Sequence, residues 1–130
     1  MKKKKVFVVD DDSSARGGLA RLLATAGYEV KACSSADEFL LISDEETSGC
    51  VVLDARMPGF SNEELKKRLT ARGIDLPLIV ISADDDPETH QRAQALGATG
   101  FFRKPVDGIA VLDAVKWAMR PQENKEKGKR

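Results

Sequence analysis

The chain has 130 residues, a length that fits one domain with its own hydrophobic core. Hydrophobic residues make up 42% and charged residues 32% of the chain, a composition that is typical of globular proteins and excludes disorder of the whole chain. Basic and acidic residues number 21 each, so no overall charge draws the protein to nucleic acid or to an anionic membrane.

The first apolar segment, residues 6–9, is short and ends at three consecutive aspartates, Asp10 to Asp12. A secretory signal peptide needs a longer apolar region, and no segment has the length of a transmembrane helix. We therefore expect a cytoplasmic protein that does not bind membranes. The two cysteines, Cys33 and Cys50, are too few for a disulfide framework, and we interpret them as buried thiols.

Five short apolar runs alternate with segments of helical pattern along the chain. They predict β-strands at residues 5–9, 29–33, 50–53, 78–81 and 100–102. Three of these runs are rich in valine and isoleucine and have little polar alternation, which is typical of strands covered on both faces. Strands of this kind in alternation with helices predict βα units and a parallel sheet.

Start and stop signals for helices lie between the predicted strands. Apolar residues recur at helical spacing after the first strand, and Gly27 is expected to end this first helix. Ser35 with Glu38, and Ser61 with Glu64, have the spacing of capping boxes, in which each of the two side chains satisfies a free backbone N–H group. These pairs predict the starts of the second and third helices.

The last two helices follow from acidic N-cap residues. Asp86 precedes Pro87, which suits an N-cap and a first helical residue, and predicts a fourth helix over residues 87–96 that offers little apolar surface to the core. A fifth helix is expected to begin near Asp107. The apolar stripe of this last helix comprises Leu112, Val115 and Met119.

The order of these elements predicts an α/β fold, (βα)5 and doubly wound, with a parallel five-stranded sheet of order 2-1-3-4-5. In such a sheet, ligands bind at the carboxyl ends of the strands, at the switch between the first and third strands. We expect this domain to cover residues 1–120. Residues 121–130 are polar and are expected to form a disordered tail or the stub of a linker.

Carboxylates end two of the predicted strands at the edge where ligands bind. Asp10, Asp11 and Asp12 follow the first strand, and Asp54 follows the third. Two like charges about 4 Å apart repel by roughly 4 kcal/mol at an effective dielectric constant near 20. A hard divalent cation removes this repulsion, and Mg²⁺ prefers sites made of oxygen ligands and water. The carboxylates therefore predict a Mg²⁺ site.

Two more polar residues complete the chemistry expected at this edge. Ser82 follows the fourth strand and Lys104 the fifth. With Mg²⁺ they would neutralise or hydrogen-bond the oxygens of a phosphoryl group, which makes Asp54 a credible nucleophile that forms an aspartyl phosphate. Each element alone has a structural explanation as a helix cap, a solvated acidic turn or a Lys-Pro turn. Their order at successive strand ends favours a functional site.

Five segments carry a resemblance to a known family: VFVVDDDSSARGGLARLL, SSADEFL, CVVLDARMPG, LIVISA and GATGFFRKPV. Over residues 6–119 the sequence resembles a response regulator receiver domain of the CheY-like superfamily, nearest the FixJ-like group. The resemblance implies a flavodoxin-like fold and a phosphoprotein of two-component signal transduction that switches conformation. It implies no enzyme beyond catalysis of its own phosphorylation and dephosphorylation.

The resemblance assigns roles to single residues around Mg²⁺. Asp54 matches the phosphoacceptor, which is also a metal ligand. Asp11 matches the carboxylate that contacts Mg²⁺, and Asp10 matches its neighbour that holds metal-bound water. Arg56 matches the position whose backbone carbonyl completes the metal shell. Asp12 has no matched role, and we interpret it as an acidic residue at the start of the first helix.

The resemblance also assigns the phosphoryl contacts and the switch. Ser82 matches the residue whose hydroxyl bonds the phosphoryl group, Lys104 the lysine that contacts it, and Phe101 the aromatic switch that turns inward as Ser82 moves. Output is then expected from the face formed by the fourth helix, fifth strand and fifth helix. Asn62 stands where relatives often have glycine, and asparagine tolerates a left-handed backbone. His90, on the fourth helix, is interpreted as an exposed surface residue.

The implied partners are a sensor histidine kinase and an output domain or partner protein, with a phosphorylation-dependent homodimer left open and no nucleic-acid or membrane binding by this chain. Two alternatives remain. A haloacid-dehalogenase-like phosphatase would use VFVVD with Asp12 and Ser14 as its start motif, but Asp54 would then have no role. A pseudo-receiver, an interaction module that never becomes phosphorylated, is disfavoured because all residues of the site are present.

Overall fold

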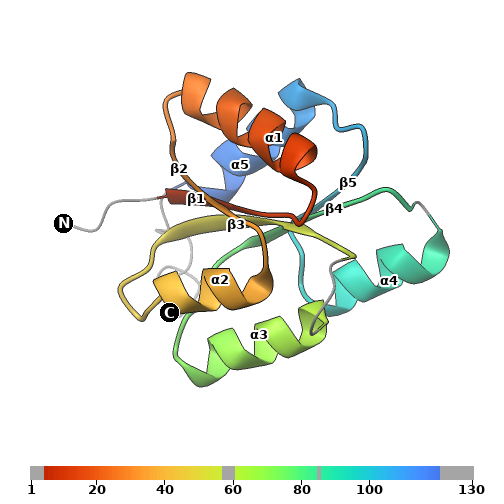
Figure 1. Ribbon diagram of the computed structural model, residues 1–130. Coiled ribbons are helices and arrows are strands. Elements are labelled where there is room, and N and C mark those ends of the chain that lie inside the picture. The colour runs from red at the N-terminus through yellow and green to blue at the C-terminus, as the bar shows by residue number, and fades with distance from the viewer. Residues whose placement is uncertain (1–4, 57–60, 85, 121–130) are drawn as a thin grey trace, which may run out of the picture.

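The computed structural model describes residues 5–56, 61–84 and 86–120. One sheet of five parallel strands crosses this part of the chain in the order β2-β1-β3-β4-β5 (Figure 1). The strand bounds are Lys5–Val9 for β1, Glu29–Cys33 for β2, Gly49–Asp54 for β3, Leu78–Ser82 for β4 and Gly100–Arg103 for β5. The predicted fold class and strand order are therefore confirmed.

Helices alternate with the strands and cover both faces of the sheet (Figure 1). Their bounds are Ser13–Thr25 for α1, Ala36–Ile42 for α2, Asn62–Ala71 for α3, Pro87–Ala95 for α4 and Gly108–Ala118 for α5. The buried residues of α1 and α5 share one apolar cluster, and those of α2 and α3 share the other. The helix α4 lies on the side of α2 and α3, and Leu96 at its end belongs to their cluster.

Alternation along each strand sends side chains to the two clusters in turn. In β1, Val6 and Val8 pack with α1 and α5, whereas Phe7 and Val9 pack with α2 and α3. These four side chains are at most 2% exposed. The ring of Phe7 meets that of Phe39 in α2 edge to face, with 5.1 Å between centroids. A strand buried on both faces needs an apolar residue at every position, which explains the lack of polar alternation in the sequence.

Both cysteines are buried and free, as the sequence predicts. Cys33 belongs to the cluster under α2 and α3, and Cys50 belongs to the cluster under α1 and α5. Burial raises the pKa of the Cys33 thiol to about 11 and that of Cys50 to about 12. Both thiols therefore stay protonated at neutral pH and act as small apolar side chains.

Side chains cap the amino end of each described helix, at the residues that the sequence singles out. The N-cap residues are Asp12, Ser35, Ser61, Asp86 and Asp107. Each side chain accepts a hydrogen bond from a backbone N–H of the first turn, so each satisfies a group that the helix itself leaves free. The predicted helix starts are confirmed.

The second half of each predicted capping box is wrong in detail. The Glu38 carboxylate accepts from the N–H of Ser34 at 2.7 Å and from its hydroxyl at 2.9 Å, so it bonds the residue before the N-cap Ser35. Ser34 offers two donors to the same oxygen, and this outweighs one backbone N–H. The Glu64 carboxylate instead accepts from Arg68 Nε at 3.2 Å, one turn along α3, because a charged donor gives the stronger bond.

Four described glycines adopt a positive φ that other residues disfavour, and two of them shape the elements of the sheet and its first helix. Gly27 follows the last residues of α1 with φ 101°, and it ends that helix as predicted. Gly49 opens β3 with φ 129°, and a Cβ atom there would lie 1.8 Å from the carbonyl oxygen of Lys5. Lys5 is the partner of Gly49 in the β1–β3 register, so glycine allows the two strands to approach at their first residue pair.

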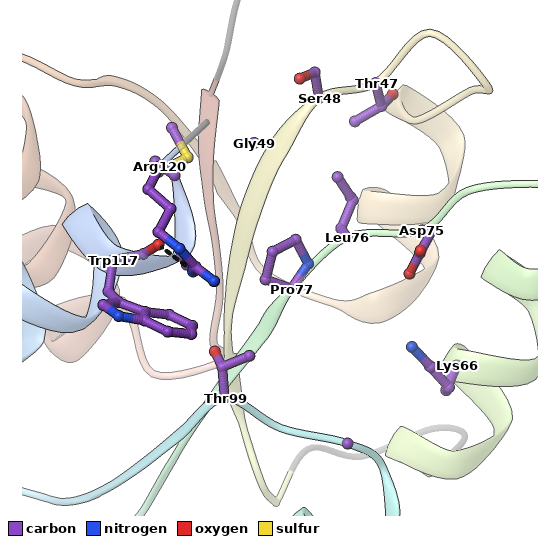
Figure 2. A pocket seen from close by; sticks show the side chains of 13 residues that line it. Thr47, Ser48, Gly49, Lys66, Asp75, Leu76, Pro77, Thr99, Trp117 and Arg120 are labelled. Carbon is purple, nitrogen blue, oxygen red and sulfur yellow. Dashed lines mark hydrogen bonds between the residues drawn. The ribbon is translucent and has the colours of Figure 1, made fainter. Parts of the chain in front are cut away.

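The amino ends of the strands form the edge of the sheet opposite the predicted site. A pocket of about 430 Å³ lies there, with Thr99 and Pro77 on one side and the end of α5 on the other (Figure 2). The Arg120 guanidinium lies over the Trp117 ring at 3.4 Å from its centroid. Among the described residues, no helix is both long and apolar enough to span a membrane. The predicted tail at 121–130, residues 57–59 of the CVVLDARMPG segment, Phe60 and Asp85 lie outside the described residues.

Candidate functional site

The carboxyl ends of β1 and β3 bring three carboxylates together. The two strands are neighbours in the sheet, and Val9 of β1 pairs with Leu53 of β3, so the residues that follow them meet at one edge. One ligand oxygen from each of Asp10, Asp11 and Asp54 lies within 4.8 Å of the others. Asp10 and Asp54 are buried, and Asp11 is exposed. The predicted carboxylate cluster therefore forms.

Backbone donors fix one oxygen of each buried carboxylate. The N–H of Asp12 donates to Asp10 Oδ1 at 3.0 Å, and the N–H of Arg56 donates to Asp54 Oδ1 at 3.1 Å. Arg16 of α1 donates from Nη1 to the carbonyl oxygen of Asp10 at 2.8 Å and holds the backbone of this turn. The second oxygen of each carboxylate then remains for a ligand or a cation.

Lys104 places its ammonium group against both of these second oxygens. Its Nζ lies 3.0 Å from Asp10 Oδ2 and 3.4 Å from Asp54 Oδ2. The backbone holds Lys104 in place, because its N–H donates to the carbonyl oxygen of Ser82 at 2.8 Å and so extends the pairing of β5 with β4. Burial opposes the charge, but close contact with the Asp10 carboxylate and the negative charges of Asp54 and Asp10 raise the pKa of Lys104 above its usual value.

Asp54 is a carboxyl group of this site whose pKa is raised by its environment. Its side chain ends β3 and the residue is 5% exposed. Burial raises the pKa of Asp54 to about 6, the hydrogen bond from the Arg56 N–H opposes the rise, and the negative charge of Asp10 adds to it, while Lys104 lowers it. At neutral pH most of the Asp54 population is ionised, and the carboxylate keeps a free oxygen lone pair.

Ser82 ends β4 next to this cluster and is fully buried. Its Oγ accepts a hydrogen bond from the N–H of Asp84 at 3.0 Å. The side chain of Asp84 forms an ion pair with Arg56, so an exposed link joins the segment after β3 to the segment after β4. This link was not predicted from the sequence. Opposite charges in the two segments that follow neighbouring strands were the available signal.

Asn62 supports the turn after β3 with its side chain. Its Nδ2 donates to the carbonyl oxygen of Asp54 at 3.3 Å and to that of Ala55 at 3.5 Å. Asn62 does not use the left-handed backbone that asparagine tolerates, because the described positive φ angles are all at glycine and Asn62 is the first residue of α3. The amide replaces backbone freedom with two hydrogen bonds, a role that the sequence did not reveal.

Asp12 lies outside the carboxylate cluster, as predicted. Its Oδ1 accepts from the N–H of Ser14 at 3.0 Å and from that of Ala15 at 3.4 Å, so the side chain caps α1. A phosphatase that used VFVVD with Asp12 as its start motif would need this carboxylate at the reacting centre. Its engagement in the helix cap argues against that alternative.

Phe101 lies in β5, half-buried, two residue pairs before the end of the β4–β5 ladder. Its ring stacks on that of His90 in α4, with 4.0 Å between centroids and 32° between ring planes. His90 is exposed, as predicted, but its contact with Phe101 was not foreseen. Residues eleven positions apart in sequence, on a helix and a strand, give no periodic signal of such a contact.

The acidic cluster fits a hard divalent cation. All its ligand atoms are carboxylate oxygens, the donor type that Mg²⁺ prefers. Asp10 Oδ2 is buried and has no hydrogen-bond partner among the described residues, and the Lys104 ammonium faces it at 3.0 Å. One ammonium shared by the buried carboxylates of Asp10 and Asp54 leaves part of their negative charge uncompensated, and a further cation would offset it. The carbonyl group of Arg56 follows the same turn and is the predicted fourth ligand.

Comparison with known proteins places this geometry in context. The family model described as response regulator receiver domain matches residues 6–116. The transcriptional regulatory protein FixJ of Azorhizobium caulinodans is 41% identical over 111 residues, which cover 85% of this chain and 53% of the relative. The transcriptional regulatory protein TdiR of Thauera aromatica is 41% identical over 114 residues, which cover 88% and 50%. The chain thus spans about half the length of these curated relatives.

Solved structures resemble the fold over most of the chain. The structure of the response regulator StyR has a TM-score of 0.84 at 41% identity and is matched over 98% of this chain and 64% of its own. The crystal structure titled FixJ-N has a TM-score of 0.81 at 34% identity, over 92% of this chain and 95% of its own.

Proposed function

Since the chain belongs to the response regulator receiver domain family, the phosphoacceptor modules of two-component systems, we propose that Asp54 is the residue that accepts the phosphoryl group. One observation carries this proposal: Asp54 ends the central strand β3 with one oxygen fixed by the Arg56 N–H and the other facing Lys104 at 3.4 Å. Such a carboxylate has a fixed orientation and is ionised at neutral pH. It also lies next to an ammonium group that can bind the oxygens of a phosphoryl group.

The donor is the phosphohistidine of a sensor histidine kinase. An oxygen of Asp54 attacks phosphorus, the new O–P bond forms as the N–P bond breaks, and the imidazole nitrogen keeps the electron pair. Lys104 then exchanges its contacts with Asp10 and Asp54 for contacts with phosphoryl oxygens. The Ser82 hydroxyl turns from the Asp84 N–H and donates to another of them. The receiver contributes position and charge, and the kinase contributes the activated donor.

Mg²⁺ is the proposed cofactor of this site. The carboxylates of Asp10, Asp11 and Asp54 and the carbonyl group of Arg56 would hold it, with Asp10 acting through metal-bound water. When bound, Mg²⁺ supplies positive charge that offsets the negative charge of the incoming phosphoryl group. The mutual approach of these carboxylates within 4.8 Å supports the assignment, because a cation relieves their repulsion.

The conformational response is proposed to run from Ser82 to Phe101. A phosphoryl group on Asp54 draws the Ser82 hydroxyl toward it, and Phe101 turns inward behind it. The face formed by α4, β5 and α5 then changes shape and presents a different surface to its partner. The half-buried position of Phe101 in β5 supports this route, because its ring already contacts α4 through His90.

The wider setting follows from the same family. The proposed partners are a sensor histidine kinase and an output domain or partner protein, and a phosphorylation-dependent homodimer through the α4–β5–α5 face is one form of output. Neither nucleic acid nor a membrane is a proposed ligand of this chain, and its place is the cytoplasm. Residues 1–120 form the proposed receiver, with 121–130 as tail or linker. Its catalysis is limited to its own phosphorylation and dephosphorylation.

Incubation with acetyl phosphate and Mg²⁺, followed by intact-mass measurement, tests the proposal. We expect one phosphoryl adduct that hydroxylamine and base remove, and no adduct on the Asp54→Asn variant, which keeps the shape of the side chain. Persistence of the adduct in that variant would contradict the assignment of Asp54. General hydrolysis of phosphate esters would instead support a phosphatase, and no adduct at all would support a pseudo-receiver.

A further inference from the structure

We propose that the side chain of His90 holds Phe101 in its resting position and thereby opposes the conformational change that follows phosphorylation. This inference rests on the proposed function, in which Phe101 changes position. The two ring centroids are 4.0 Å apart and the ring planes are inclined by 32°. The rings are therefore in direct contact, at a separation slightly shorter than the about 4.5–7 Å that is common for aromatic pairs.

The stack ties the first half of α4 to β5, and the residues that α4 buries are few and small. The buried residues of α4 are Thr89 and Ala93, which are both small, and Leu96 follows at the C-cap. A pocket of about 80 Å³ between α4 and the start of α3 is lined in part by Ala93 and Leu96. An aromatic contact on such a helix contributes a large share of what holds it against the sheet.

A second attachment joins the start of α4 to the phosphoryl site. The Ser82 Oγ accepts from the Asp84 N–H at 3.0 Å, and Asp86 caps α4 two residues later. When the Ser82 hydroxyl turns toward a phosphoryl group, this attachment is lost and the segment before α4 is released. The His90–Phe101 stack then still holds α4 and Phe101 in the resting arrangement, together with the small buried residues of α4.

The stack belongs to the resting state alone. In the structure that contains it, Lys104 contacts the carboxylates of Asp10 and Asp54, and Ser82 bonds its own loop. When Phe101 turns inward, its ring leaves the ring of His90. A contact made in one of two states shifts the equilibrium toward that state by its own free energy. His90 is thus a positioning residue. Its contact sets how much free energy the bonds of the phosphoryl group must supply before Phe101 turns inward.

A double-mutant cycle on the affinity for beryllofluoride, a phosphoryl mimic, tests this inference in the presence of Mg²⁺. His90→Ala should raise the apparent affinity about 2-fold to 12-fold, the range that corresponds to loss of one aromatic pair. In the Phe101→Ala background the same substitution should have no effect, because the partner ring is absent. Phe101→Leu serves as the background if Phe101→Ala fails to fold.

Two further variants separate a ring contact from a general effect on α4. His90→Phe keeps an aromatic ring and should restore the wild-type affinity. Gln91→Ala changes the exposed neighbour on the same helix and should leave the affinity at the wild-type value. Urea unfolding of each variant shows that it is folded under the conditions of the titration.

The outcomes distinguish this inference from the proposed function. Wild-type binding of beryllofluoride with an unchanged or lower affinity in His90→Ala would overturn the role of His90 and leave the proposed function intact. An increase that persists undiminished when Phe101 is replaced would also overturn it. Absence of beryllofluoride binding by the wild-type chain would overturn the proposed function itself.

Discussion

At the scale of single residues, the site combines a buried carboxylate with incomplete compensation of its charge. Asp54 lies beside Asp10, and Lys104 is the cation that faces both. Burial is the largest cause that raises the pKa of Asp54 to about 6, well above the usual value of 3.8. The fold therefore disfavours the ionised form of Asp54 when no further cation is present. The burial of Asp54 therefore orients the nucleophile and also lowers the stability of the folded protein when no ligand is bound.

This leads to a prediction about stability and pH. A carboxyl group with a raised pKa in the folded state contributes stability that is full below its unfolded-state pKa and is lost as the pH rises through about 6. In EDTA, Asp54→Asn should therefore match the wild type near pH 4 and exceed its free energy of unfolding by about 1–3 kcal/mol at pH 7.5. Urea unfolding from pH 4 to pH 8 measures this difference.

The matched control for this prediction is Asp113→Asn, the same substitution at an exposed position of α5. It should leave the pH dependence of unfolding close to that of the wild type. A pH-independent difference between Asp54→Asn and the wild type would show that the Asp54 environment does not disfavour its charge.

The neighbouring aspartates, Asp11 and Asp12, should separate by function. Asp11→Ala removes a charged ligand and should weaken Mg²⁺ binding at least about 10-fold, since a unit charge at this range is worth several kcal/mol before solvent screening. Asp12→Ala should lower the free energy of unfolding by about 1 kcal/mol through loss of the α1 cap and leave the Mg²⁺ affinity nearly unchanged. Calorimetric Mg²⁺ titration with urea unfolding tests both, and the reverse pattern would mean that the metal ligand was assigned one residue too early.

At the scale of elements, the close approach of β1 and β3 depends on one glycine. A Cβ at Gly49 would lie 1.8 Å from the Lys5 carbonyl oxygen, so Gly49→Ala forces the strands apart. We expect a loss of about 2–4 kcal/mol from overpacking together with backbone strain. Gly73→Ala is the control, because Gly73 has φ 75° but a Cβ atom there would meet nothing within 4 Å, and it should lose only about 1–2 kcal/mol. Equal losses in urea unfolding would show that strand contact is not the cause.

Elements with local signals could be predicted from the sequence. The apolar runs placed β1 and β2 at their observed bounds, and Asp86 and Asp107 marked the starts of α4 and α5. The predicted β4 ended one residue before Ser82, because the ladder continues through the bond from the Lys104 N–H to the Ser82 carbonyl oxygen, which depends on the neighbouring strand. Apolar periodicity carries no information about such a bond.

Some features of the site could likewise be predicted from the sequence, and others could not. The residues that hold its charges could be predicted because parallel strands bring their carboxyl ends to one edge, whatever the loops do. The Arg56–Asp84 ion pair, the Asn62 amide bonds and the His90–Phe101 stack could not, because each joins segments whose relative position is set by the packing of whole helices. Secondary structure and strand order determine the position of a residue in the fold, and tertiary packing determines which other residues its side chain contacts.

At the scale of the whole molecule, the two edges of the sheet have different chemistry. The carboxyl edge concentrates buried charges, and the amino edge carries the pocket beside Trp117 and Arg120 (Figures 1 and 2). Between them, both faces of the sheet are sealed by apolar clusters under the helices. A change at the carboxyl edge therefore passes most easily through α4, which adjoins that edge and contributes few large buried side chains. This arrangement suits a module that converts a local charge into a change of surface.

The most direct test of this account identifies the phosphorylated atom in the intact chain. Treatment with acetyl phosphate and Mg²⁺, followed by borohydride reduction, converts an aspartyl phosphate to homoserine, which tandem mass spectrometry locates in the sequence. We predict homoserine at position 54 alone, and its absence when Mg²⁺ is removed by EDTA. Homoserine at Asp10 or Asp11, or a phosphorylated chain with none at Asp54, would contradict the central claim.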